Sequence, residues 1–260
     1  GAAGIVIGTH ALLEEKVQFA DLGLVVVDEQ HRFGVEQRAA LAAKAGESRP
    51  HVLVMTATPI PRTVAMTVFG DLETSTLTEL PAGRAPVQSS VVPVRYQPSW
   101  LDRAWQRVRE EVEKGHQVYV VCPRVDADDK QAAGEVRLAA VEEVAPLLSS
   151  EPLAGLRVES MHGRMAPDRK EAVMRAFADG EVDVLVATTV IEVGVDVANA
   201  TVMVILDADR FGIAQLHQLR GRVGRGGHPG LCLLVTQAEK DTPALARLVA
   251  VAATTDGFEL

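Results

Sequence analysis

Short apolar runs alternate along the chain with stretches of helical spacing. The runs are continuous rather than alternating with polar residues, which is typical of strands buried on both faces of a parallel sheet. They predict strands at 5–7, 24–27, 51–55, 117–122, 156–161, 182–187, 201–206 and 231–235. The stretches between them predict helices at 35–45, 99–114, 135–149, 167–179 and 243–253. Strands alternating with helices predict a mostly parallel α/β fold.

Glycine and proline divide this pattern into two α/β units. Residues 80–86 read Leu-Pro-Ala-Gly-Arg-Ala-Pro, and two prolines and a glycine so close together indicate a hinge. After the hinge, Ser99 with Asp102 three residues later resembles a capping box at a helix start. Gly115 and Gly180 are placed to end the helices that precede them. Pro61 suits the first turn of a helix before the hinge.

Composition narrows the class of protein. With 47% hydrophobic residues in 260, the chain can build a packed core, and no apolar run reaches the roughly 18 residues that cross a bilayer. The two cysteines show no CxxC spacing, which argues against a disulfide scaffold or zinc site and suits a reducing cytosol. A net charge of −9 argues against a nucleic-acid partner. The charge is uneven, however, because residues 213–230 hold three Arg, two His and no acid.

Polar motifs follow several predicted strands, where open α/β sheets collect functional groups. Asp28-Glu29 follows the strand at 24–27; an aspartate there can hold Mg²⁺ beside a triphosphate, and a glutamate can polarise an attacking water. The same pair can equally cap a following helix. The hydroxyls of Thr56 and Thr58 could relay hydrogen bonds from a nucleotide site, but Thr and Pro are also ordinary turn residues.

Three further segments carry polar groups that could contact a ligand. Residues 188–196 begin with two threonines that could contact a sugar-phosphate backbone. They end at Asp196, which could accept a hydrogen bond from a ribose hydroxyl. The alternative is that this segment is only a capped helix start. His162-Gly163-Arg164 is a weaker signal of the same kind. Residues 215–226 contain Arg222 and Arg225, each preceded by glycine. Such arginines can stabilise charge on a transferred phosphoryl group, but a plain basic loop or a nucleic-acid patch is also possible.

The order of these motifs resembles the superfamily two helicases and translocases. Within that superfamily, the segments 28–34, 56–63, 162–165, 188–196 and 215–226 are most similar to the RecG family of bacterial branched-DNA helicases. The resemblance runs from Gly8 to Phe258. It implies two RecA-like lobes of the P-loop NTPase fold that bind ATP between them and move along DNA.

The resemblance also implies a role for each motif residue. Asp28 would bind Mg²⁺ through water and Glu29 would activate the attacking water. Two residues, Gly194 and Asp196, would hold the nucleotide from the second lobe, and three others would complete the catalytic site: Gln218, Arg222 and Arg225. Residues that couple hydrolysis to movement would be Gln30, His31, Thr56 and Thr58. Residues near the DNA backbone would be Thr9, His10, Arg164, Thr188 and Thr189.

One family motif is absent from the sequence. No Gly-x-x-x-x-Gly-Lys-Ser/Thr occurs, so the phosphate-binding loop and its lysine are missing. We therefore expect a fragment: a first lobe at 1–86 truncated at its N-terminus, a second lobe at 87–239, and the start of a C-terminal hook at 240–260. We expect no ATP turnover by the fragment alone.

The expected parent is a monomeric, cytoplasmic and nucleoid-associated enzyme that uses ATP and Mg²⁺ on branched double-stranded DNA, without a membrane. Two alternatives stay open. One is the transcription-repair coupling translocase, which shares this motor, although His31 and the 81–86 stretch favour the RecG family. The other is a non-catalytic nucleic-acid-binding relative. The paired acids and arginines argue against that reading, since such a protein does not need them.

Overall fold

A computed structural model of the chain divides it into two compact units, Gly1–Pro59 and Ile60–Leu260. The structure describes residues 4–14, 16–28, 50–56, 73, 75, 77, 85–126, 138–192 and 196–254. The predicted helix at 35–45, the helix start at Pro61 and residues 80–84 of the hinge lie outside these ranges. The domain limits expected at 86/87 and 239/240 stay predictions.

The first unit contains a parallel pair of strands, β1 (Leu24–Val27) and β2 (His51–Val54), together with a short 3-10 helix, η1 (His10–Leu13). Both strands were predicted and are confirmed. Leu24 lies opposite His51 and Val27 opposite Val54, so the two strands end at the same edge. The strand predicted at 5–7 is wrong. Ile7 is 92% exposed, and in the described part of this unit only β1 and β2 pair, so the apolar run has no hydrogen-bonding neighbour.

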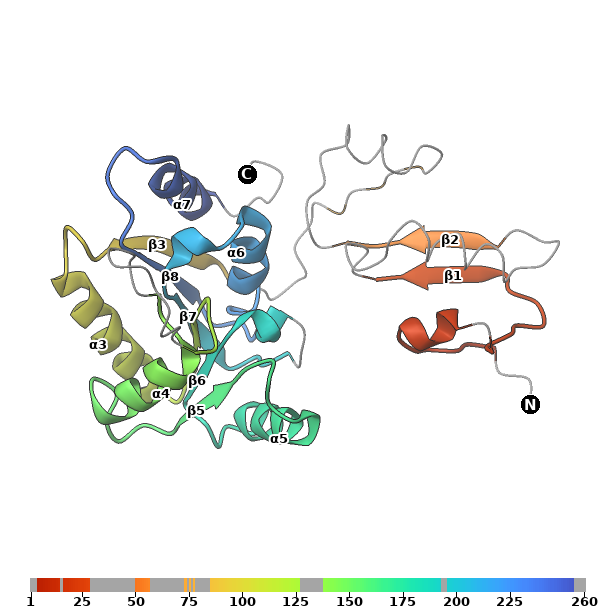
Figure 1. Cartoon of the computed structure of the whole chain (residues 1–260), viewed down its shortest axis with the longest axis horizontal. Helices are drawn as coiled ribbons and strands as arrows, with labels where there is room; N and C mark the ends of the chain where they lie inside the picture. Colours follow the sequence, from red (N-terminus) through yellow and green to blue (C-terminus); the bar gives the residue numbers. More distant parts are fainter. Residues whose placement is uncertain are drawn as a thin grey trace. The chain divides into compact units, whose positions relative to one another are not determined.

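The second unit is built on a six-stranded parallel sheet in the order β3-β8-β7-β4-β6-β5 (Figure 1). Its strands are β3 (Val87–Pro93), β4 (Gln117–Val121), β5 (Val158–Met161), β6 (Val184–Ala187), β7 (Ala200–Ile205) and β8 (Gly230–Thr236). Five of the six were predicted. The edge strand β3 was missed because its apolar run is interrupted by Gln88, Ser89 and Ser90. The predicted parallel α/β fold is confirmed.

Helices cover both faces of this sheet. They are α3 (Ser99–Glu113), α4 (Val141–Ser150), α5 (Pro167–Ala178), α6 (Ile213–Arg220) and α7 (Pro243–Ala253), with 3-10 helices η3 (Thr189–Glu192) and η4 (Ala208–Arg210). Alternate residues of β4 explain why the strands are apolar throughout. Val118 and Val120 belong to the core shared with α3 and α4, whereas Tyr119 and Val121 belong to the core shared with α5, α6 and α7.

Two helix starts differ from the prediction. Ser99 is the first residue of α3 and Pro98 its N-cap, and no side chain caps this end. Carbonyls of Gln97 and Pro98 instead accept the first free N–H groups, so the expected capping box does not form. The helix predicted from 135 begins at Val141, after an extended segment that pairs with Arg124. The predicted helix ends are confirmed, with Gly115 and Gly180 at φ +87° and +76°.

Candidate functional site

Two predicted site residues of the first unit lie just beyond the carboxyl ends of its paired strands. Asp28 directly follows β1 and Thr56 lies two residues after β2, and both are exposed. The two strands are in register, and the Met55 N–H donates to the Val27 carbonyl, so the chains leave side by side. Thr9 is exposed just before η1, which His10 begins. Glu29, Gln30, His31 and Thr58 lie outside the described residues, as does the side chain of His10.

In the second unit, residues 221–229 join α6 to β8, and we call this segment the arginine loop. Arg225 donates from Nε to the Gly221 carbonyl (2.8 Å), and its Nη1 lies 3.3 Å from Asp196 Oδ1. Arg222 and Arg225 both lie close enough to the Tyr119 hydroxyl for their charges to act on it, as does Asp196. Burial raises the pKa of Tyr119 to about 12, the arginines oppose that rise, and Asp196 adds to it. The structure therefore brings three of the predicted residues together.

The arginine loop is seated on the segment that leads into β7. The Gly224 N–H donates to the Ala200 carbonyl (3.3 Å). At Gly226, a Cβ atom would lie 2.2 Å from the Ala198 carbonyl oxygen, so only glycine fits. Gln218 lies half-buried on α6, one turn before Arg222. Gly194 falls outside the described residues.

The loop lies at the amino ends of β7 and β8, whereas the other predicted motifs follow strands at their carboxyl ends. Here the motif follows a helix instead of a strand. Helix α6 returns the chain to the edge where β8 begins, so the arginines are at the opposite edge.

Arg220, which belongs to the same motif, has a structural role. It is only 3% exposed, donates from Nη1 to the Val251 carbonyl (2.7 Å), and contacts His217 Nδ1 through Nη2 (2.8 Å). A second bond reaches the Thr254 carbonyl (2.5 Å), so Arg220 binds carbonyls at the C-terminal end of α7.

A second group of predicted residues gathers at the carboxyl ends of β5 and β6. The Thr188 N–H donates to the Met161 carbonyl at the end of β5 (3.3 Å), and Thr189 begins η3. Arg164 follows β5, is 67% exposed and pairs with Asp126, which follows β4. Strands of four to six residues separate this group from the arginine loop by roughly 15 to 20 Å.

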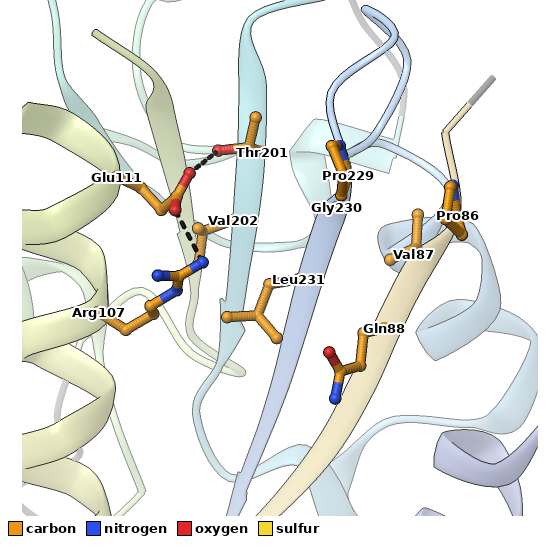
Figure 2. A pocket seen from close by; sticks show the side chains of 10 residues that line it. All are labelled: Pro86, Val87, Gln88, Arg107, Glu111, Thr201, Val202, Pro229, Gly230 and Leu231. Atoms are coloured by element: carbon orange, nitrogen blue, oxygen red, sulfur yellow. Dashed lines mark hydrogen bonds and ion pairs between the residues drawn. The ribbon is translucent and has the colours of Figure 1, made fainter. Parts of the chain in front are cut away.

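A cavity in the second unit contains none of the predicted site residues. It has a volume of about 480 Å³ and lies between α3 and the amino ends of β7, β8 and β3 (Figure 2). Figure 2 shows the Glu111 carboxylate bonded to both Arg107 and Thr201. Burial would raise the pKa of Glu111, but bonds from Lys114 and His116 and the charge of Arg107 lower it to about 2. This carboxylate was missed in the sequence analysis because it lies in the last turn of α3 and belongs to no motif.

No group of three or more metal-ligating side chains occurs among the described residues. Asp28, exposed at the end of β1, is the one predicted metal ligand that they include. A single carboxylate there suits Mg²⁺ held mainly by water and phosphate. No helix within the described ranges has the length and apolar character needed to span a membrane.

Comparison with known proteins accounts for the motif order. Residues 1–67 match the DEAD/DEAH box helicase family and residues 101–227 the helicase conserved C-terminal domain. The chain is 64% identical over its whole length to the ATP-dependent DNA helicase RecG of Mycobacterium tuberculosis, and 46% identical to that of Bacillus subtilis. Over its whole length the chain is therefore similar to RecG helicases. It spans 36% of the length of each of these two RecG relatives.

Solved structures agree with this assignment. A RecG structure bound to a three-way DNA junction matches all of the chain and 32% of its own, with a TM-score of 0.76 and 42% identity. Yeast Dbp5 bound to RNA and ADP BeF3 matches 96% of the chain with a TM-score of 0.57 at 15% identity, and this likeness shows the fold alone. The RecA-like α/β class expected from the sequence is confirmed.

Proposed function

We propose that the chain is the motor region of an ATP-dependent helicase that remodels branched DNA in recombination and repair. The observation that carries the proposal is the gathering of Arg222, Arg225 and Asp196 around one loop. Two relatives support the proposal. The chain is 64% identical to an ATP-dependent DNA helicase, and it is similar to a RecG structure bound to a three-way DNA junction.

The guanidinium of Arg225 is already oriented for binding an anion in the structure. Its Nε bond to the Gly221 carbonyl orients the guanidinium, and its Nη1 is the group that meets the Asp196 carboxylate. Arg225 is 31% exposed and Asp196 61%, so a phosphate can approach this end of the guanidinium. A preoriented cation stabilises developing charge without reorganising during the reaction, which is the role we assign to Arg225. Arg222 and Gln218 would support it, and Gly194 and Asp196 would hold the nucleotide.

The first unit would supply the metal and the attacking water. Asp28 would hold Mg²⁺ through water, and the metal would neutralise phosphate charge. Glu29 would orient and deprotonate the attacking water. Four residues would couple hydrolysis to movement: Gln30, His31, Thr56 and Thr58.

The carboxyl-end group would contact the DNA backbone. The guanidinium of Arg164 is exposed, Thr189 is half-buried and Thr188 is buried. Guanidinium and hydroxyl groups are typical phosphate ligands. From the second unit the contacts would come from Arg164, Thr188 and Thr189, and the first unit would contribute Thr9 and His10. Because the rigid sheet lies between this group and the arginine loop, a shift at one end can be transmitted to the other. The full-length protein would act as a monomer in the bacterial cytoplasm, at the nucleoid.

Steady-state ATP hydrolysis tests the proposal in the full-length protein with forked DNA. Arg225→Ala should lower kcat by about a thousandfold, the scale of an arginine finger, while binding of a fluorescent ATP analogue persists. The matched control is Arg175→Ala, which removes an exposed arginine paired with Glu171 on α5 and should change neither quantity. Wild-type turnover by Arg225→Ala would refute the assignment.

A further inference from the structure

The turn between α3 and β4, residues 114–116, together with Gln117 at the start of β4, contacts both segments that carry the Arg225–Asp196 pair. On the Asp196 side, Asn199 Nδ2 donates to the Gly115 carbonyl (2.8 Å), and the Gln117 N–H donates to the Asn199 carbonyl (3.0 Å). Asn199 lies three residues after Asp196 and one before β7. The position of Asp196 therefore depends on this turn.

On the arginine side, the contact is between two histidine rings. The ring of His116 packs against that of His228, with centroids 4.8 Å apart and planes inclined by 49°. His228 lies three residues after Arg225, in the arginine loop. The same turn therefore supports the other half of the pair.

The turn is itself held in place by the buried carboxylate of Glu111. His116 Nδ1 lies 2.8 Å from Glu111 Oε2, and Lys114 Nζ donates to Glu111 Oε1 (2.8 Å). The Thr201 hydroxyl of β7 donates to the same carboxylate (3.3 Å). Since Glu111 is 5% exposed and anchored to the sheet, His116 presents its ring to His228 in a fixed orientation.

We propose that His116 and His228 are positioning residues that hold the arginine loop so that Arg225 meets its anion. The guanidinium of Arg225 bonds to the Gly221 carbonyl and pairs with Asp196, so we assign the two histidines an indirect action through the backbone of the loop. That the histidines hold the loop can be tested independently of any function. The effect of the loop's position on ATP hydrolysis rests on the function proposed above for Arg225.

Limited trypsin digestion, which measures local opening of the arginine loop, tests directly whether the histidines hold the loop in place. Trypsin cleaves after arginine only when the chain opens, so the rate of Arg225–Gly226 cleavage, followed by peptide mass in the full-length protein, reports the open population. His228→Ala should raise this rate about tenfold, the change expected for one lost ring contact. His228→Phe, which keeps a ring, should restore the wild-type rate, and Glu171→Ala on α5 is the control. An unchanged rate in His228→Ala would overturn the proposal.

The rate of ATP hydrolysis tests whether the position of the arginine loop matters for the action of Arg225. His228→Ala should lower kcat on the order of tenfold to a hundredfold, with KM for ATP unchanged. In an Arg225→Ala background it should lower kcat no further, because it acts through that residue. Additive losses would overturn the positioning role. If Arg225→Ala itself hydrolyses ATP normally, the function proposed for Arg225 fails, and the trypsin rates still decide whether the histidines hold the loop.

Discussion

Replacing Gly226 with alanine should separate the rate of hydrolysis from the stability of the fold. The added Cβ would lie 2.2 Å from the Ala198 carbonyl oxygen and 2.9 Å from its carbonyl carbon. A carbon atom normally stays about 3.3 Å or more from a carbonyl oxygen, so the arginine loop must move by about 1 Å. The clashing atoms are backbone, and they cannot rotate away as the end of a side chain could.

A displacement of this size is costly for catalysis and modest for folding. A misplacement of about 1 Å can lower a catalysed rate about a hundredfold. Overpacking of this kind costs about 1 to 3 kcal/mol, which a large protein tolerates. We therefore expect Gly226→Ala in the full-length protein to lower kcat about a hundredfold, while circular dichroism and ATP binding stay close to wild type.

Gly212→Ala is the matched control. Gly212 is the N-cap of α6, and a Cβ there would lie 3.9 Å from Gln215 Oε1, an ordinary contact. Its kcat should equal that of the wild type. If Gly226→Ala matches this control in DNA-stimulated ATP hydrolysis, then close seating of the loop on Ala198 does not position Arg225, and the reasoning fails.

Three further results are expected. Glu111→Gln should destabilise the protein by about 3 kcal/mol near pH 7, because the pKa of Glu111 falls from 4.5 to about 2 on folding. This difference in urea unfolding should be constant above about pH 5 and shrink as pH falls through 4.5 towards 2; a difference that does not change with pH contradicts the ion-pair account. Arg164→Ala should reduce by about 1 the slope of log affinity for DNA against log salt, and Asp126→Asn, which removes a competing carboxylate, should raise that affinity. Unchanged binding in both variants would remove Arg164 from the DNA contacts. The 260-residue chain, lacking a phosphate-binding lysine, should not hydrolyse ATP with forked DNA, and measurable turnover by the pure chain would disprove this.

The sequence predicted those parts of the fold that depend on local pattern. Continuous apolar runs such as 184–187 are typical of strands buried on two faces, and this pattern identified five strands of the second sheet, although the similar run at 5–7 forms no strand. Gly115 and Gly180 marked helix ends because a left-handed residue is cheapest as glycine. The motif order likewise indicated the resemblance to RecG helicases that the comparisons bear out, although it could not place those motifs on the sheet.

The tertiary structure decided what each similar residue does. Arg220, Arg222 and Arg225 look alike in the sequence, yet Arg220 turns into the core to bind carbonyls of α7, while Arg225 turns to Asp196. The difference follows from helix geometry, because Arg220 ends α6 on its buried side and the glycines that follow redirect the chain. Contacts between residues over 100 positions apart, such as His116 with His228, leave no local pattern. They exist only because parallel strands bring distant turns to the same edge of a sheet.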